Sequence, residues 1–285
     1  MPNWVRNELT IDFSNDAQKE AYFKIVGDPG CNLDFNKIIP MPKELEIEDG
    51  SRMYDGLKCV ELYADPNCPL RDQHIPKMTQ DEYDAIVRYH SATPTALGFG
   101  KQVSAKDENV RVQEMYAIRK RIAEYEKDPT KVDEHWTKTL ELGWQAACNI
   151  INYGSPSWYN WRITNWGTKW NVASDEGEIN PDGSIYFSTA WSAPMPIIEK
   201  LAYMLADTPG LTGTLLINHR WADEDMGNNC GEQVIRVDCG AYGVEQEGYI
   251  DDGGMGRDEA YKLACDIWGW DPEDEDDEDD EDSNN

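Results

Sequence analysis

The chain has 285 residues and a formal net charge of −29, with 26 basic against 55 acidic residues. This length can bury a substantial core in one large or two small domains, and 40% apolar content with eleven tryptophans excludes a wholly disordered chain. No apolar run is long enough to span a bilayer. The N-terminal sequence MPNWVRNELT lacks the basic and apolar regions of a secretory signal, so we expect a cytosolic protein in the cell that makes it.

The first segment predicts a strand followed by a helix. In NWVRNELTIDF, polar and apolar residues alternate, which places Val5, Leu9 and Ile11 on one apolar face. The next residues, SNDAQKEAYFKIVG, predict a helix that Ser14 caps and Gly27 ends. The sequence FNKIIPMPKEL then predicts a turn that leads into a different region.

Residues 43–154 have a different character. Their first part is expected to be irregular because it is rich in turn residues. Apolar residues then recur every three or four positions in residues 110–128 and again in residues 132–151, which predicts two helices. The linker KDPTK would join them as an antiparallel hairpin.

The most unusual stretch is WYNWRITNWGTKW, residues 158–170, with four tryptophans. We expect residues 158–173 to be extended, with a bend at Gly167. Further along, the patterns predict a strand in residues 184–191, a helix in 192–210, a strand in 212–221, a hairpin from 232 to 250 and a short final helix in 257–270.

Without residues 43–154, the element order is strand, helix, strand, strand, helix, strand. This order predicts an α+β fold, a ferredoxin-like split βαβ antiparallel sheet with a large, partly helical insertion. The expected parts are a core of residues 1–42 and 155–220, an insertion of 43–154, a hairpin and helix of 221–270 that extend the core, and a disordered acidic tail of 271–285.

Several blocks of sequence also resemble a known family. MPNWVRNELTI, FNKIIPMPKEL, NWRITNWGTKWN and IYFSTAWSAPMPIIEKLA are together similar to the YubB-type ferredoxin-like proteins of bacteriophages and plasmids, which mostly lack an assigned function. The resemblance implies the fold and an origin on a mobile genetic element. It implies no catalytic residues, and it leaves residues 43–154, the segment after Trp221 and the tail uncovered.

The common catalytic and metal-binding patterns are missing from the sequence. There is no CxxC, no HExxH and no GxSxG, and the scattered cysteines are typical of reduced structural thiols. Asp223–Asp225 form a weak candidate for a cation site, and His219 is either a structural or a catalytic residue. We therefore expect no cofactor, no metal and no enzyme activity; a metal-dependent enzyme at Asp223–Asp225 is the less favoured alternative.

The tryptophans are expected to serve packing or protein binding rather than base stacking. The signature of RNA-recognition modules is missing, and phosphate binding requires basic residues that this chain lacks. Packing would direct indole N–H groups to turn carbonyls and would let Lys169 lie over a ring. A nucleic-acid-binding module that uses residues 158–170 as an aromatic sheet remains the alternative from another class.

The final fifteen residues carry eleven acidic side chains and no basic ones, and removing them still leaves a net charge of −18. Such a tail either solubilises the protein or competes with nucleic acid for a basic surface. We therefore expect a phage or mobile-element protein that inhibits a host defence nuclease complex of the restriction, CRISPR or Gabija type by covering its nucleic-acid site. Direct binding to nucleic acid or membranes is not expected, and a homo-oligomer is compatible with the sequence. The candidate contact residues are Trp158, Tyr159, Trp161, Trp166, Trp170, Arg119, Lys120, Arg121, Asp274, Glu275, Asp276 and Asp277.

Overall fold

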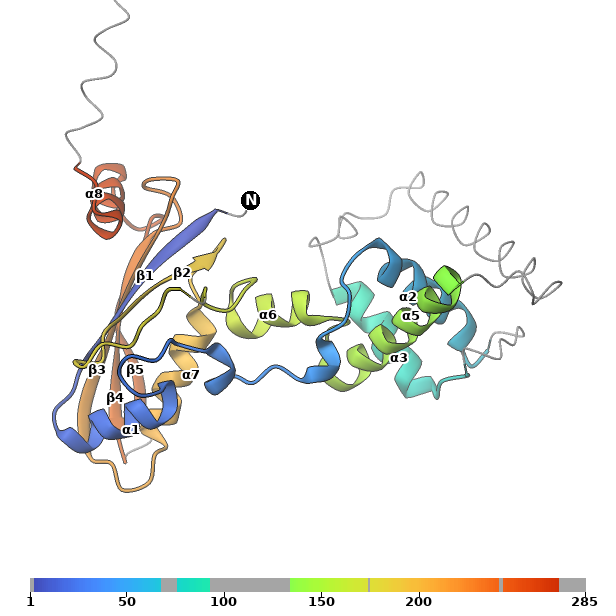
Figure 1. The fold of residues 1–285 in the computed structure, drawn as a ribbon, viewed down its shortest axis with the longest axis horizontal. Coiled ribbons are helices and arrows are strands. Elements are labelled where there is room, and N and C mark those ends of the chain that lie inside the picture. The colour runs from blue at the N-terminus through green and yellow to red at the C-terminus, as the bar shows by residue number, and fades with distance from the viewer. Residues whose placement is uncertain (1–2, 68–75, 93–133, 174, 241–242, 272–285) are drawn as a thin grey trace, which may run out of the picture. The chain divides into compact units, whose positions relative to one another are not determined.

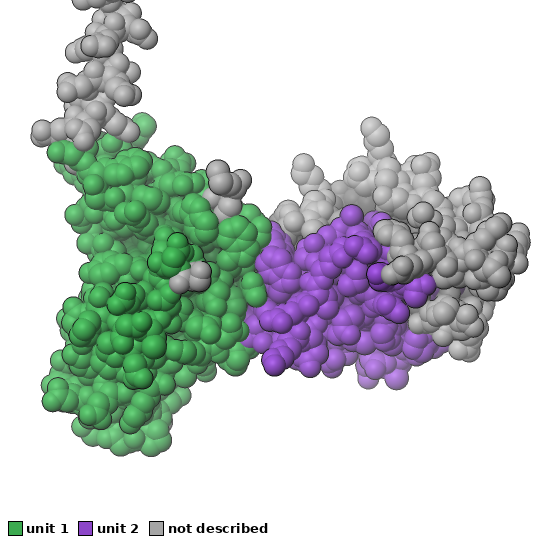
Figure 2. Space-filling view, viewed as in Figure 1, with its two compact units in different colours: residues 1–40, 162–285 green, residues 41–161 purple. Residues whose placement is uncertain are grey.

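The computed structural model describes residues 3–67, 76–92, 134–173, 175–240 and 243–271. The chain divides into two compact units, which Figure 2 distinguishes by colour. Unit 1 consists of residues 1–40 and 162–285, and unit 2 of residues 41–161. The predicted acidic tail, apart from Asp271, lies outside the described residues.

Unit 1 contains a five-stranded sheet in the order β2-β1-β3-β4-β5, in which every neighbouring pair is antiparallel (Figure 1). The predicted α+β class with a ferredoxin-like antiparallel sheet is therefore confirmed. The predicted hairpin corresponds to β4 and β5. The strands are β1 (Trp4–Asp12), β2 (Ile185–Ala190), β3 (Gly213–Asp223), β4 (Gly231–Cys239) and β5 (Gly243–Asp251).

Three helices cover the two faces of this sheet. Helices α1 (Asp16–Val26) and α7 (Met195–Ala206) pack on one face, and α8 (Arg257–Trp268) contacts β1 and β3 on the other. Asn15 caps α1 by accepting a hydrogen bond from the Gln18 N–H, so the prediction that Ser14 is the cap was wrong by one residue. Gly27 ends the helix as predicted.

The core of unit 1 lies between the sheet and helices α1 and α7. Alternate residues of β1 to β4 are buried there, as the alternation of apolar residues in β1 predicted, whereas no residue of the edge strand β5 is buried. The segment 33–38, with a short 3-10 helix η1 (Phe35–Lys37), adds Phe35, whose ring lies 6.1 Å from Phe187 and 5.7 Å from Trp166. Large buried side chains of this core are Leu9, Tyr22, Phe35, Trp166, Ile179, Ile185 and Ile197.

The prediction of an extended conformation for residues 158–173 was wrong. Trp158–Trp166 form helix α6, which ends at Gly167 with a φ of +79°. Tryptophan and tyrosine have a high strand propensity, but that propensity mainly reflects how well they fit a half-buried sheet surface. Here Trp158 and Trp161 are three positions apart, which is a helical spacing, and Trp166 at the end of the helix is fully buried against Phe35.

Unit 2 is helical. The expectation that its first part is irregular was wrong, because α2 (Ser51–Ala64) and α3 (Gln80–Ala92) lie there, after a 3-10 turn η2 (Lys43–Leu45). The second predicted helix of the insertion is α5 (Glu134–Tyr153), whereas the first, in residues 110–128, lies outside the described residues. Helix α5 packs mainly on α2.

Helices α2 and α5 approach each other at a pair of glycines. A Cβ atom placed on Gly143 would lie 2.1 Å from the carbonyl carbon of Gly56, and one on Gly56 would lie 2.0 Å from the Thr139 carbonyl oxygen. Neither position has room for a side chain. The core around this contact contains Met53, Leu57, Val60, Ile86, Ala146, Ala147 and Ile150.

Candidate protein-interaction site

Three tryptophans and a lysine gather at one corner of unit 1, where β1 begins and β2 ends. We call Trp4, Lys169, Trp170 and Trp191 the aromatic corner. The rings of Trp4 and Trp170 lie 5.7 Å apart, and the Lys169 ammonium lies 4.8 Å from the Trp170 ring and 4.6 Å from the Trp191 ring. The predicted position of Lys169 over a ring is therefore confirmed, with two rings in place of one.

Trp191 is the most exposed member of the corner, and its backbone is strained. Its side chain is 40% exposed, and its φ of +73° is in the left-handed region, which a bulky side chain rarely adopts. Such strain persists only where the surrounding structure imposes it, and it is concentrated at functional sites. The exposed ring at this backbone position is the feature that marks the corner as a candidate site.

Hydrogen bonds on both sides of Trp191 impose this conformation. Its N–H donates to the Asn3 carbonyl at 2.9 Å, and its carbonyl accepts from the Asn229 side-chain amide at 2.9 Å. Asn229 also donates to Asp223 Oδ2 at 3.0 Å, while Asn3 donates to Asp223 Oδ1 at 3.3 Å. The buried carboxylate of Asp223 thus fixes both residues that hold Trp191.

The segment that carries Lys169 is tied to the same corner. The Thr168 hydroxyl donates to the Ala190 carbonyl at 2.9 Å, and the Ala190 N–H donates to the Thr168 hydroxyl at 3.1 Å. Ser192 donates to the Gly167 carbonyl. A corner held on both sides is pre-organised, so a partner would meet large rigid rings at a small cost in conformational entropy.

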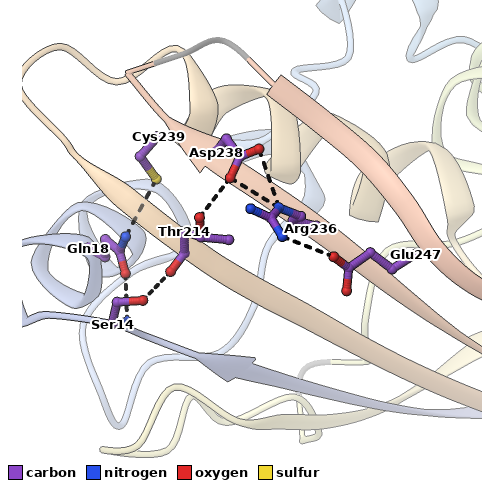
Figure 3. Close-up of polar contacts among 7 residues, drawn as sticks. All are labelled: Ser14, Gln18, Thr214, Arg236, Asp238, Cys239 and Glu247. Atoms are coloured by element: carbon purple, nitrogen blue, oxygen red, sulfur yellow. Dashed lines mark hydrogen bonds and ion pairs between the residues drawn. The ribbon is translucent and has the colours of Figure 1, made fainter.

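The sheet face opposite α1 and α7 carries arginines that are each engaged by other groups. Arg236 lies between Asp238, at 3.2 Å, and Glu247, at 3.4 Å, as Figure 3 shows. Arg220 pairs with Glu8 at 3.1 Å and with Asp266, and Arg6 lies 4.4 Å above the Trp268 ring. Arg220 and Arg236 therefore compensate neighbouring carboxylates, and Arg6 is engaged by the ring and the carbonyl of Trp268.

The pKa values on this face follow from these contacts. The hydrogen bond from Thr214 and the nearby charge of Arg236 hold the pKa of Asp238 below its usual value. The bond to Glu247 and the charge of Asp238 raise the pKa of Arg236. Both groups stay charged around neutral pH and neutralise each other, which leaves little charge for a phosphate backbone.

A row of polar side chains crosses the sheet, buried from Thr189 to Gln233 and exposed at its last member, Gln246. It runs from Thr189 on β2 through Asn7, His219 and Gln233 to Gln246 on β5, with separations of 2.9, 3.0, 3.1 and 3.2 Å. Burial lowers the pKa of His219 to about 3. A neutral, fully buried imidazole with both nitrogens bonded has no access to a substrate, which favours the structural role of His219 over a catalytic one.

The residues proposed from the sequence are not brought together. Trp170 belongs to the aromatic corner, whereas Trp158 and Tyr159 are half-buried on α6. Trp161 is 6% exposed and Trp166 is fully buried, with its indole N–H bonded to the Ile39 carbonyl at 2.9 Å. Lying outside the described residues are Arg119, Lys120, Arg121, Asp274, Glu275, Asp276 and Asp277.

Sequence reasoning did not identify Trp4 and Trp191 as site residues. In the sequence, Trp4 is one member of an alternating strand pattern, and Trp191 is the last residue of the strand predicted in residues 184–191. The left-handed conformation of Trp191 depends on Asn3 and Asn229, which are distant in sequence. The available signal was the turn sequence Trp191–Ser192–Ala193–Pro194, which excludes a regular strand beyond Ala190.

Within the described ranges, no group of three or more histidine, cysteine, aspartate or glutamate side chains is placed to hold a metal ion. The carboxylate of Asp223, from the candidate cation cluster, is bonded to Asn3, Asn229 and the Asp225 N–H. The six cysteines that the structure describes are all in the thiol form. None of the described helices is long and apolar enough to cross a membrane.

Residues 165–282 match a family model described as the ferredoxin-like domain in Api92-like protein. The matched region contains β2 to β5 with α7 and α8, and it includes most of the aromatic corner. The chain is therefore similar to this ferredoxin-like family over the second part of unit 1. No curated protein and no solved structure matches the chain.

Proposed function

We propose that this chain is a non-catalytic binding protein of a phage or mobile element, related to the YubB-type proteins, that acts in the host cell cytoplasm. Its target is a host protein, and its effect is to cover the basic nucleic-acid site of a defence nuclease complex of the restriction, CRISPR or Gabija type. The observation that carries the proposal is the aromatic corner, a pre-organised cluster on a strongly acidic chain in which Trp191 is exposed and the other members are partly exposed.

The composition of the corner favours a protein partner. Tryptophan is among the residues that contribute most to protein–protein binding, especially where the ring is held in place before binding. Two rings of the corner share the Lys169 ammonium, so the cation is already engaged. A phosphate group would have to compete with these rings for Lys169.

Electrostatics favour a basic target. The net charge of −29 steers a positively charged surface towards this chain and repels nucleic acid. The paired arginines of the sheet add no positive patch, as Arg236 between Asp238 and Glu247 illustrates. The alternative of an aromatic sheet for base stacking loses its structural basis, because residues 158–166 are a helix.

The experiment is affinity capture from infected host lysate followed by mass spectrometry, with the full-length protein and two variants. Trp191→Ala removes the exposed ring of the corner, and Tyr203→Ala removes a similarly exposed ring from α7 as the matched control. We expect a nucleic-acid-acting complex to be retained by the wild type and by Tyr203→Ala but lost with Trp191→Ala. A partner without a nucleic-acid site, or equal retention by all three proteins, would contradict the proposal.

The captured complex then provides the second test. Purified protein should inhibit cleavage by the complex and should compete with its nucleic-acid substrate, because both would occupy the same basic surface. Inhibition that is independent of substrate concentration would exclude occlusion. Gel shifts with the protein alone should show no binding to DNA or RNA at physiological salt.

A further inference from the structure

A second surface of unit 1 has the features of a binding groove. It is an open groove of about 1080 Å³ between the β3–β4 loop, the β5–α8 loop, the first half of α8 and Trp270. The Trp270 ring is 52% exposed and lies 6.1 Å from the Trp268 ring. The groove has room for several side chains of a partner.

The groove is negatively charged. Four carboxylates line it, from Glu224, Asp225, Asp252 and Asp258, against the two basic side chains of Arg257 and Lys262. The carboxylate lining is independent of the tail, which adds further negative charge next to Trp270 in the sequence.

The pKa of the buried Cys230 thiol is raised mainly by burial, and one of the groove carboxylates, Asp252, adds to the effect. The raised pKa is about 11, and the carboxylate of Asp251 contributes as well. The carboxylate of Asp252 thus disfavours a negative charge beside the groove and favours a positive one.

We propose that this groove binds an extended basic segment of the partner protein, with arginine or lysine side chains lying against Trp270 and between the carboxylates. The inference rests on the proposed function and names the chemistry of the partner. An arginine over an exposed tryptophan gains a cation–π interaction. The thioether side chains of Met226 and Met255, which also line the groove, suit the alkyl part of such a residue.

Charge complementarity favours a basic segment of a partner protein over the other possible occupants of the groove. The acidic tail of the same chain and a second copy, with a net charge of −29, would both be repelled from the carboxylates. Nucleic acid is excluded for the same reason. A basic segment next to a nucleic-acid site would supply the positive charge that the groove lacks.

The test measures binding of a fluorescein-labelled hexa-arginine peptide to the full-length protein by fluorescence anisotropy at physiological salt. The groove variant is Asp225→Asn/Asp258→Asn, and its matched control is Glu20→Gln/Glu245→Gln, which removes two exposed carboxylates outside the groove lining. Both retain the acidic tail, so its contribution to peptide binding is the same.

We expect the groove variant to weaken binding about five-fold, since two exposed ion pairs are lost. The control should change it less than about two-fold, because charges beyond about 8 Å are screened. Trp270→Ala should weaken binding about three-fold through the lost cation–π contact, whereas Tyr203→Ala should not. Equal weakening by the groove and control variants, or no binding of the peptide, would overturn the proposal.

The outcome is separable from that of the proposed function. If the peptide does not distinguish the groove variant while Trp191→Ala still abolishes capture of the nuclease complex, the groove proposal fails and the proposed function stands. If the peptide requires the groove but the captured partner has no nucleic-acid site, the groove stands and the occlusion mechanism fails.

Discussion

The buried side chain of His219 provides a test of the fold. Its lowered pKa predicts how strongly the free energy of unfolding depends on pH. In the row across the sheet, His219 Nε2 lies 3.0 Å from Asn7 Oδ1, an acceptor, so Nε2 carries the proton. Nδ1 lies 3.1 Å from the Gln233 side-chain nitrogen, a donor, so Nδ1 must be unprotonated. A second proton on the ring would face that donor and break the bond.

The stability of unit 1 should therefore depend on pH with a defined sign. The folded pKa of His219 is about 3, below the unfolded value of about 6.5. Between these values the unfolded state binds more protons, so the free energy of unfolding falls as pH falls below about 6.5. The slope is about 1.4 kcal/mol per pH unit, which amounts to about 2 kcal/mol lost between pH 8 and pH 5.

The assay is urea unfolding at pH 8 and at pH 5, monitored by hydrogen exchange of peptides from β3 and β4. These peptides report on unit 1 alone, which is necessary because the two units need not unfold together. His219→Gln keeps a donor and an acceptor but cannot titrate, so its loss of stability between the two pH values should be smaller by about 2 kcal/mol. Both proteins contain the same carboxylates, so the contribution of these groups to the pH dependence of stability cancels in the comparison. An identical pH dependence for wild type and variant, or an imidazole that titrates near 6.5 by NMR, would refute the reasoning.

Three further predictions concern other parts of the chain. Gly143→Ala should lower the stability of unit 2 by about 2 kcal/mol through overpacking against α2, measured by hydrogen exchange of α2 and α5 under urea. Gly50→Ala, where a Cβ meets no described atom within 4 Å, is the control, and equal effects would contradict the close contact. Asp223→Ala should cost about 2 kcal/mol, because the bonds from Asn3, Asn229 and the Asp225 N–H to a buried carboxylate are lost, and should weaken partner binding; unchanged stability and binding would show that Asp223 does not support Trp191. Deletion of residues 271–285 should slow association with a basic partner about three-fold and leave dissociation unchanged, as surface plasmon resonance at two salt concentrations would show; a complex indifferent to salt would contradict this.

The elements with regular apolar periodicity were predictable from the sequence. Strand β1, helices α1 and α7 and the β4–β5 hairpin follow patterns that each segment carries in itself. The acidic character and the lack of a catalytic motif were also readable directly. These features depend on local residue order, so no knowledge of distant contacts is needed to infer them.

The tertiary structure determined the features that depend on contacts between residues distant in the sequence. Helix α6 took the place of a strand, and its last ring, Trp166, packs against Phe35 of the η1 segment, more than a hundred residues earlier. The Asn3–Asp223 bond joins residues 220 positions apart, and the His219–Asn7 bond joins residues 212 apart. The exposed conformation of Trp191 and the burial of His219 both depend on such contacts, and local propensity contains no information about them.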